Sequence, residues 1–454
     1  MTRHFINWLV RTITNTFFRR IDVVGIENVP AEGPVIFAGN HPNALMDGWL
    51  LTAKCGRWPL HFMANAKLWN YKILGRLMNL SGAVPVYSRE EHGDDADNSQ
   101  AFEKLYEVIE SGNCMGIFPE GISHAESQLI RLKTGAARIA LAVAERGNTV
   151  VTIVPVGLNY IHRHRFRSQV MIEFGEAIVI DRHWATQYRN DNPGTVRKLT
   201  DHLANALLNV TLNAPDWNTL RFVQTARRLY KPKTADLTPG QYVELNRRFV
   251  ERYVELQDDP ELQAFRKRTE DYQARLDMLG LKDYQLRQSV SLSEAMRKIM
   301  ARSLMMLLLL PLAIPGALLH LPVGWVAAVV GERFSYELDD IATLKVFATM
   351  LLLPILYVAV GVYVGMNFGA WWALASIFVL SFSFAASLQL LEAETSLLMS
   401  MLSILRVTRL SHEVEELRSL RAGLVEQVRE LTERMADPNA PRMFTQEDFN
   451  NPDV

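Results

Sequence analysis

Two long stretches without a charged residue are the features that most limit how this chain can fold. Residues 304–330 contain no Asp, Glu, Lys or Arg, and neither do residues 346–391. One helical crossing of a bilayer core needs about 20 apolar residues, so the second stretch is long enough for two crossings. We therefore expect an integral membrane protein, with a membrane region over 303–395 and transmembrane helices at about 345–366 and 369–391.

The first uncharged stretch differs from the second because it contains three prolines, Pro311, Pro315 and Pro322. Proline removes a backbone hydrogen bond and kinks a helix, which disfavours one straight crossing. Basic residues flank the stretch on both sides, and Lys and Arg prefer the cytoplasmic side of a membrane. We expect residues 304–330 to form a re-entrant segment, with a kinked full crossing as the alternative. The same bias places the N-terminal domain on the cytoplasmic side.

The N-terminal residues 1–20 mix large apolar side chains with arginines. Between residues 4 and 20 the apolar positions recur at helical spacing, which predicts an amphipathic helix. Such a helix either lies in the headgroup region of a membrane or packs on its own domain.

Residues 21–230 alternate short apolar runs with stretches of helical periodicity. This alternation predicts an α/β domain with a mostly parallel sheet flanked by helices. The acidic segment 90–99 reads as a surface loop. The predicted strands lie at 35–38, 61–64, 83–87, 115–118, 150–156 and 170–174, and helices are predicted at 100–111 and 134–144.

After residue 230, the segments outside the two uncharged stretches are charged and favour helix. We expect a helical appendage over 231–302 and a disordered, proline-containing tail over 437–454. Between them, apolar residues recur at two positions of a seven-residue repeat from Val407 to Met435, with Arg421 as the exception. This pattern predicts a coiled-coil helix over 400–436, through which the protein self-associates or which folds back onto another helix of the same chain.

The overall composition excludes some classes of protein. The chain has 454 residues, with 48 basic and 49 acidic side chains and a formal net charge of −1. Nucleic-acid binders usually show a basic excess, so no nucleic-acid partner is expected. The two cysteines, Cys55 and Cys114, form neither a disulfide framework nor a zinc pattern, and no metal site is expected.

A histidine and an aspartate lie six positions apart, directly after the apolar run 34–38. A carboxylate bonded to one imidazole nitrogen fixes the tautomer and leaves the other nitrogen free to take a proton, so His41 and Asp47 are candidate catalytic residues. Residues i and i+6 lie on different faces of a regular helix, so the pair requires a non-helical segment between them. Pro42 and Asn43 are suited to such a segment.

A second candidate group ends the apolar run 115–118. Proline stops the hydrogen-bond ladder of a strand and glycine permits a tight turn, so we expect Glu120 at a strand end beside His41. There, Glu120 either hydrogen-bonds substrate hydroxyls or holds a basic partner. The candidate substrate-binding residues of this group are Phe118, Pro119, Glu120 and Gly121.

Two further cations are candidates for binding a phosphate. Arg89 follows the apolar run 83–87 and offers a planar fork of donors. Lys133 precedes a predicted helix, whose N-terminus also favours anions. Either residue is alternatively an ordinary surface cation. The basic cluster 162–167 either faces anionic headgroups and phosphates or is a solvated loop.

Four of these stretches, in this order over about residues 30–180, resemble the glycerolipid acyltransferase superfamily. The family includes lysophosphatidic acid and glycerol-3-phosphate acyltransferases. Its first block is Asn-His, four residues and Asp, whereas here five residues separate His41 from Asp47. That spacing resembles the glycerol-3-phosphate/dihydroxyacetone-phosphate acyltransferase branch. The other three blocks are matched by Arg89, by 118–121 and by 154–156.

The resemblance implies an activity. His41, assisted by Asp47, would deprotonate a glycerol hydroxyl, which attacks the thioester carbonyl of acyl-CoA or an acyl carrier protein. Arg89, with Lys133, would hold the acceptor's phosphate, and residues 118–121 would shape its pocket. Backbone amides near His41 or Gly121 are the candidates for stabilising the oxyanion. The acyl thioester is a co-substrate, and no cofactor is implied.

Three hypotheses remain open at this point. The first is a membrane-bound acyltransferase in phospholipid synthesis with 1-acylglycerol-3-phosphate as acceptor. The second keeps the reaction and changes the acceptor to glycerol-3-phosphate or dihydroxyacetone phosphate, which the longer first block favours. The third is a non-catalytic, lipid-binding membrane scaffold whose heptads tether partners. The intact set of His, Asp, Glu and Arg argues against the third, since a scaffold has no need of it.

Overall fold

The structure, a computed structural model, divides into two compact units. Unit 1 consists of Met1–Trp217, Leu237–Arg247 and Ser335–Thr343, and unit 2 of Asn218–Asp236, Arg248–Phe334 and Leu344–Val454. The predicted domain borders at 230 and 302 therefore do not coincide with the borders between the units. The residues described are 2–70, 72–87, 99–147, 149–232, 235, 237–279, 281, 283–286, 292–409, 411–435 and 443–444.

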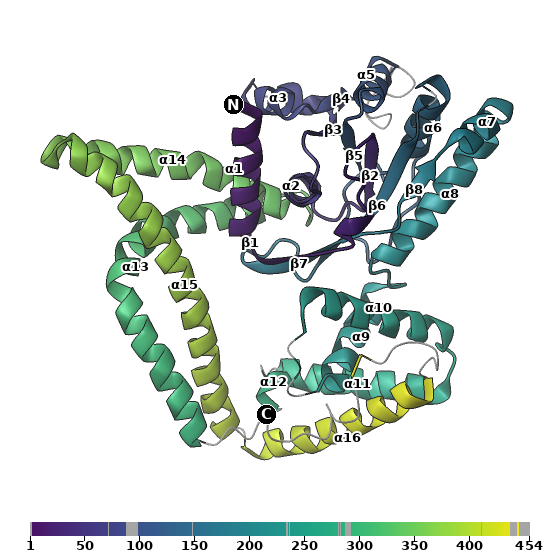
Figure 1. Cartoon of the computed structure of the whole chain (residues 1–454). Coiled ribbons are helices and arrows are strands. Elements are labelled where there is room, and N and C mark those ends of the chain that lie inside the picture. Colours follow the sequence, from purple (N-terminus) through teal and green to yellow (C-terminus); the bar gives the residue numbers. More distant parts are fainter. Residues whose placement is uncertain are drawn as a thin grey trace. The chain divides into compact units, whose positions relative to one another are not determined.

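Unit 1 is built on one eight-stranded, mostly parallel sheet (Figure 1), which confirms the predicted fold class. The order is β1-β7-β6-β2-β5-β3-β4, and β8 pairs with β6. The β6–β7 and β6–β8 pairs are antiparallel, and the other pairs are parallel. The strands are β1 Phe18–Val24, β2 Val35–Gly39, β3 Leu60–Asn65, β4 Val84–Val86, β5 Cys114–Ile117, β6 Val151–Tyr160, β7 Ser168–Phe174 and β8 Ile178–Ile180.

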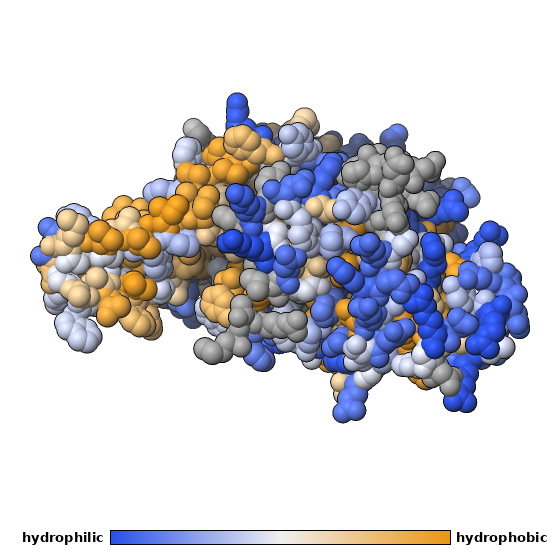
Figure 2. Space-filling view, turned by 90° about the horizontal axis from the view of Figure 1, so that it is seen from above, coloured by the Kyte–Doolittle hydropathy of each residue, from blue (hydrophilic) through white to orange (hydrophobic). Residues whose placement is uncertain are grey.

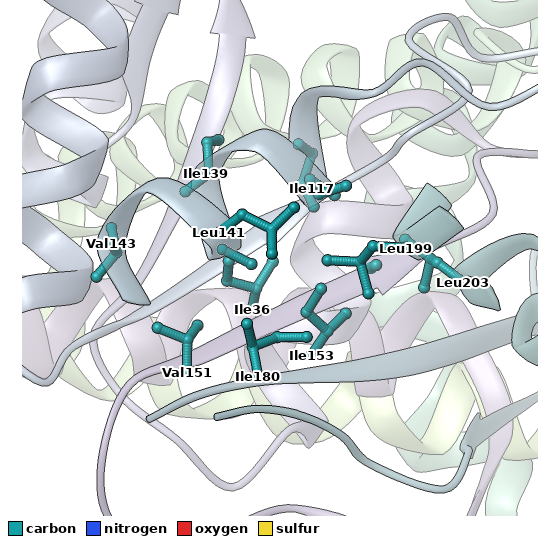
Figure 3. Packing of buried hydrophobic residues seen from close by; sticks show 14 of the residues in the cluster. Ile36, Ile117, Ile139, Leu141, Val143, Val151, Ile153, Ile180, Leu199 and Leu203 are labelled. Carbon is teal, nitrogen blue, oxygen red and sulfur yellow. The ribbon is translucent and has the colours of Figure 1, made fainter. Parts of the chain in front are cut away.

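Helices cover both faces of this sheet. Helices α5 to α8 pack on one face, and their side chains form a continuous hydrophobic cluster with β2, β5, β6 and β8 (Figure 3). Ile36 of β2 lies in this cluster, whereas its neighbours Val35 and Phe37 point to the opposite face; all three are fully buried. The helices of unit 1 are α1 Thr2–Phe17, α2 Ala44–Lys54, α3 Lys72–Ser81, α5 Ser99–Glu110, α6 Gly135–Gly147, α7 Arg182–Asn190 and α8 Asn192–Val210, with short 3-10 turns at Ile26–Asn28 and Ala66–Asn70.

The N-terminal helix α1 packs on its own unit, the second of the two interpretations of its sequence. Ile6 and Val10 lie in a small cluster with Ala53 of α2. Phe5 and Trp8 remain exposed, so α1 also presents an aromatic pair to its surroundings. The helix ends at Phe17, and residues 18–20, predicted to be helical, open strand β1 instead.

Unit 2 is helical, as predicted for the charged and apolar segments after residue 231. Within the described part of the chain, three helices contain segments long and apolar enough to cross a membrane: Leu309–Phe334, Ile341–Phe368 and Ala370–Leu390. Their exposed hydrophobic side chains form the orange surface at the left of Figure 2. The helices from α9 onward are α9 Trp217–Tyr230, α10 Pro239–Glu255, α11 Pro260–Met278, α12 Asp283–Leu286, α13 Leu292–Phe334, α14 Ile341–Phe368, α15 Ala370–Arg409 and α16 Ser411–Met435. Residues 239–247 of α10 and 341–343 of α14 belong to unit 1.

The proline-containing helix α13 is continuous, although it bends (Figure 1). The bend agrees with the expectation that the prolines disfavour one straight crossing. The re-entrant course of 304–330 stays a prediction, with a kinked full crossing as its alternative. The hydrogen-bond ladder of the helix nevertheless continues past the prolines. The reason is that serines of α15 form hydrogen bonds with the backbone of α13 near the prolines. Ser383 Oγ accepts from the Gly316 N–H and donates to the Leu312 carbonyl, each at 2.5 Å. Ser387 Oγ donates to the Ala313 carbonyl at 2.9 Å. Hydroxyls inserted into a helix ladder satisfy the backbone groups that a proline disturbs.

The heptad positions of α16 pack against α11 and α12 of the same unit. Among the described residues, Val414, Leu417, Leu424, Val428 and Leu431 are buried there. The structure thus corresponds to the alternative in which this helix folds back onto its own chain, and the coiled coil is not confirmed. The disordered-tail prediction and the 90–98 part of the predicted loop lie outside the described residues, apart from residues 443–444.

Arg421, the exception in the heptad pattern, has a buried partner. Its Nε donates to Asp283 Oδ1 at 2.9 Å, and the hydroxyl of the fully buried Tyr272 donates to the same oxygen at 2.9 Å. We expect Arg421→Leu to lower the free energy of unfolding by about 3–5 kcal/mol, because Asp283 would keep a buried charge without its guanidinium. Denaturant unfolding followed by circular dichroism measures this.

The control for this prediction is the double variant Arg421→Leu/Asp283→Leu. Replacing both members of a buried ion pair by apolar residues is often neutral, so we expect stability near that of the wild type. If Arg421→Leu instead raised stability in a concentration-dependent way, the heptads would pair between copies of the chain and the packing described here would be contradicted.

Candidate active site

Two neighbouring parallel strands bring the two motif loops to one edge of the sheet. Strands β2 and β5 pair in register, with Ala38 opposite Ile117. The loop carrying His41 follows β2, and residues 118–121 follow β5. Since parallel strands end at the same edge, the two loops lie side by side at the carboxyl end of the sheet, where α/β proteins build their sites.

The segment between His41 and Asp47 is non-helical at its start, as their spacing requires. Strand β2 ends at Gly39, and α2 begins at Ala44, which has a φ of 41°. Such a backbone conformation is strained for a residue other than glycine, and strain of this kind concentrates at functional sites. The Asn40 side chain anchors the loop, because its Oδ1 accepts from the Leu158 N–H at 2.7 Å.

His41 and Asp47 form a hydrogen-bonded pair. Nδ1 of His41 lies 2.9 Å from Asp47 Oδ2, and Asp47 is fully buried. A buried carboxylate at Nδ1 favours the tautomer that carries its proton there. The imidazole Nε2 has no hydrogen-bond partner among the described residues, and the side chain is 19% exposed. Nε2 is therefore available to accept a proton from a bound substrate.

Asp47 is held by three donors, of which the sequence indicated only His41. The Asn43 N–H donates to Oδ2 at 2.7 Å, and the Tyr160 hydroxyl donates to Oδ1 at 2.5 Å. Burial raises the pKa of the Asp47 carboxyl, while the hydrogen bonds from His41, Tyr160 and Asn43 oppose that rise. Burial and the Asp47 charge hold the pKa of Tyr160 well above its usual value, so the phenol stays protonated and donates.

The Phe118 ring covers one face of the His41 imidazole. The ring centroids of His41 and Phe118 are 4.0 Å apart, with the planes 7° from parallel. The stack limits rotation of the imidazole, which the Asp47 hydrogen bond also fixes. Phe118, predicted to bind substrate, thus contacts the histidine directly.

Glu120 connects the two motif loops through hydrogen bonds. Its Oε1 accepts from the His41 N–H at 2.8 Å, and its Oε2 accepts from the His124 side chain and, at 3.3 Å, from the Ile130 N–H. The hydrogen bond to Glu120 raises the pKa of His124. Glu120 is 1% exposed, so of the two roles predicted for it the structure supports holding a basic partner.

The turn after Phe118 explains the glycine at 121. Gly121 has a φ of 78°, and a Cβ there would lie 2.6–2.7 Å from the Lys133 side chain. The Lys133 N–H donates to the Pro119 carbonyl at 2.7 Å, which keeps Lys133 beside this turn. The amides of His41 and Gly121 themselves donate to Glu120 and to the Phe118 carbonyl, so neither is free for an oxyanion. Arg89 lies outside the described residues.

Two further charged elements of unit 1 interact with residues of the site, which the sequence did not predict. Arg163, from the basic cluster, donates through Nη1 to the carbonyls of Pro42 and His124, each at 3.2 Å, and so touches both motif loops. The segment 335–343, between two apolar helices, belongs to this unit; the charge of Asp339 acts on Arg163. Burial raises the pKa of Asp340, with contributions from its acidic neighbours, and the charge of His41 opposes the rise. The acidic residues within 337–340 are the feature of the sequence that could have indicated this segment.

Two family models match this chain. Residues 20–159 match the acyltransferase family model, and residues 222–440 match the model of the glycerol-3-phosphate acyltransferase 2 C-terminal domain. Glycerol-3-phosphate O-acyltransferase 2 of Saccharomyces cerevisiae is 36% identical over 284 residues, which are 59% of this chain and 38% of the yeast protein. An uncharacterized acyltransferase of Schizosaccharomyces pombe is 26% identical and covers 77% of this chain and 66% of its own length.

The chain therefore resembles the glycerolipid acyltransferase superfamily, as its motifs predicted. It spans less than half the length of the yeast relative that it matches at 36% identity. Among solved structures, the 1-acyl-sn-glycerophosphate acyltransferase PlsC of Thermotoga maritima is similar to this chain, with a TM-score of 0.32 and 18% sequence identity. The matched region comprises 44% of this chain and 78% of the PlsC chain.

Proposed function

We propose that this protein is a membrane-bound O-acyltransferase that transfers a fatty acyl group from an acyl thioester to a hydroxyl of glycerol-3-phosphate. The observation that carries the proposal is the His41–Asp47 pair, in which a buried carboxylate holds Nδ1 and leaves Nε2 open at the edge of the sheet. A base of this kind is what the attack of an alcohol on a thioester requires.

The proposed reaction proceeds without an acyl-enzyme. His41 Nε2 takes the proton of the acceptor hydroxyl while the hydroxyl oxygen attacks the thioester carbonyl. The tetrahedral intermediate then collapses, the C–S bond breaks, and the leaving thiolate receives the proton from His41. Asp47 stabilises the imidazolium that forms between these two steps and is not itself protonated.

The acceptor is the point on which the hypotheses differ. The match of residues 222–440 to a glycerol-3-phosphate acyltransferase domain supports glycerol-3-phosphate. The five-residue gap between His41 and Asp47 supports the same branch. Lys133 beside Gly121, and Arg89 from its place in the sequence, are the proposed cations for the acceptor's phosphate.

Membrane attachment suits this chemistry because the acyl product is a lipid. The apolar segments of α13, α14 and α15 are the proposed anchors. Basic residues flank the apolar segments: Arg297, Lys298 and Arg302 precede the apolar part of α13 within that helix, and Arg406 and Arg409 lie at the end of α15. Their bias supports placing unit 1 on the cytoplasmic side, where acyl-CoA or acyl carrier protein is available.

An acceptor panel tests the proposal. The full chain, purified in detergent with lipid, receives labelled acyl-CoA together with glycerol-3-phosphate, dihydroxyacetone phosphate or 1-acylglycerol-3-phosphate. We expect thiol release that depends on an acceptor, with the highest kcat/KM for glycerol-3-phosphate. A preference for 1-acylglycerol-3-phosphate would support the first sequence-based hypothesis instead. Absence of turnover with every acceptor, with acyl carrier protein thioester also supplied as donor, would favour the non-catalytic scaffold.

A further inference from the structure

We propose that Tyr160 is a positioning residue for the dyad, and that its hydroxyl sets how strongly Asp47 holds a proton on His41. The inference rests on the proposed function for its catalytic meaning, although the hydrogen bonds that support it do not. Tyr160 is separated from Asp47 by 113 positions, and none of the sequence motifs includes it.

The three hydrogen bonds to Asp47 are distributed unequally over its two carboxylate oxygens. Oδ2 accepts from His41 Nδ1 at 2.9 Å and from the Asn43 N–H at 2.7 Å. Among the described residues, Oδ1 accepts only from the Tyr160 hydroxyl, at 2.5 Å. Without that phenol, a fully buried carboxylate oxygen would lose its donor, and the plane of the carboxylate would lose its second anchor.

The position of Tyr160 depends on the sheet and not on a flexible loop. Tyr160 is the last residue of β6 and pairs with Val170 of β7. Its ring lies against Phe18 of β1, with centroids 5.6 Å apart. A hydroxyl carried by paired strands holds its partner more tightly than one carried by a loop.

A hydrogen bond to a carboxylate draws negative charge toward its donor. In the wild type the charge of Asp47 is shared among three donors, so less of it stabilises a protonated imidazole. Removing the phenol leaves more of that charge facing His41, which then keeps its proton to higher pH. Because the base form of His41 does the chemistry, the loss should be confined to the acid side of the pH profile.

Other charged groups face the same pair and remain in place in the test. Glu120 accepts from the His41 N–H and also holds His124. The charge of Arg163 acts on Asp47 and Tyr160, and that of Asp340 acts on His41. These groups are common to the wild type and the variant, so a difference between the two is assigned to the phenol hydroxyl.

The test is Tyr160→Phe, which keeps the ring and removes the hydroxyl. We expect the acid limb of kcat/KM for the acceptor to move up by about 0.5–1 pH unit, a threefold to tenfold loss near pH 6, with less than about a twofold change at high pH. Tyr188→Phe, on α7, removes a phenol hydroxyl elsewhere in unit 1 and should leave the profile unchanged. A loss by the same factor at every pH, or an unmoved limb, would overturn the proposal.

A second readout does not depend on turnover. In protein labelled with [13C]histidine, the resonance of His41 is assigned as the one absent from His41→Gln. We expect it to titrate at higher pH in Tyr160→Phe than in the wild type, and identical titration curves would refute the inference. If the wild type shows no acyl transfer with any acceptor, the proposed function fails, while this titration still decides the role of Tyr160.

Discussion

Replacing His41 with alanine is expected to lower acceptor-dependent thiol release by about 10²–10⁴-fold, the range that a positioned general base contributes. The loss should fall on kcat, because the imidazole acts on the proton that is transferred in the transition state and adds little to ground-state binding. The decrease in kcat is measured as release of thiol from labelled acyl-CoA, with and without glycerol-3-phosphate.

The control for this variant is His202→Ala. His202 is exposed on α8 and takes part in none of the contacts of the site, so its removal should leave the rate within about twofold. Since Phe118 stacks on His41, the thermal unfolding midpoint of His41→Ala should be recorded as well. A folded variant with the rate of the wild type would remove His41 from the mechanism.

The second large effect is expected for Asp47→Asn, again about 10²–10⁴-fold in kcat. The amide is isosteric and can still accept from His41, but it no longer stabilises the imidazolium formed during the reaction. Burial of the Asp47 charge opposes folding, as the raised pKa of the carboxyl indicates, so the neutral variant should be at least as stable as the wild type.

Activity and stability should therefore separate in this variant. Rates are measured as for His41→Ala, and thermal unfolding is measured on the same preparations. Asp201→Asn, on the exposed face of α8, makes the same chemical change outside the site and should alter neither quantity. If Asp47→Asn lost activity only in proportion to a lost folded fraction, Asp47 would be structural.

The fold of unit 1 could be predicted to a large extent because its strands are short apolar runs. Each of the six predicted runs overlaps one of the observed strands. Strand β1 was missed because Arg19, Arg20 and Asp22 interrupt its pattern, as is usual where a strand lies at the edge of a sheet. Strand β8, which has three residues, was also missed. The fold-back of α16 was left open, because a heptad pattern does not say which helix it meets.

The site could be predicted only where its residues are close in sequence or carry a motif. His41 and Asp47 share one loop and one helix, so their spacing alone indicated the pair. Tyr160 and Arg163 reach the same place only because β6 lies beside β2, which no local pattern reveals. Glu120 was placed correctly at the strand end, but its partners depend on the path of the following loop, which a sequence does not give.

A double-mutant cycle on kcat tests the central claim, that His41 and Asp47 act as one general base. Residues that act as a unit are not additive, so the double variant His41→Ala/Asp47→Asn should lie within about threefold of His41→Ala alone. If the double variant instead lost the product of the two single effects, the residues would act independently, and the account of a carboxylate-held imidazole would be contradicted.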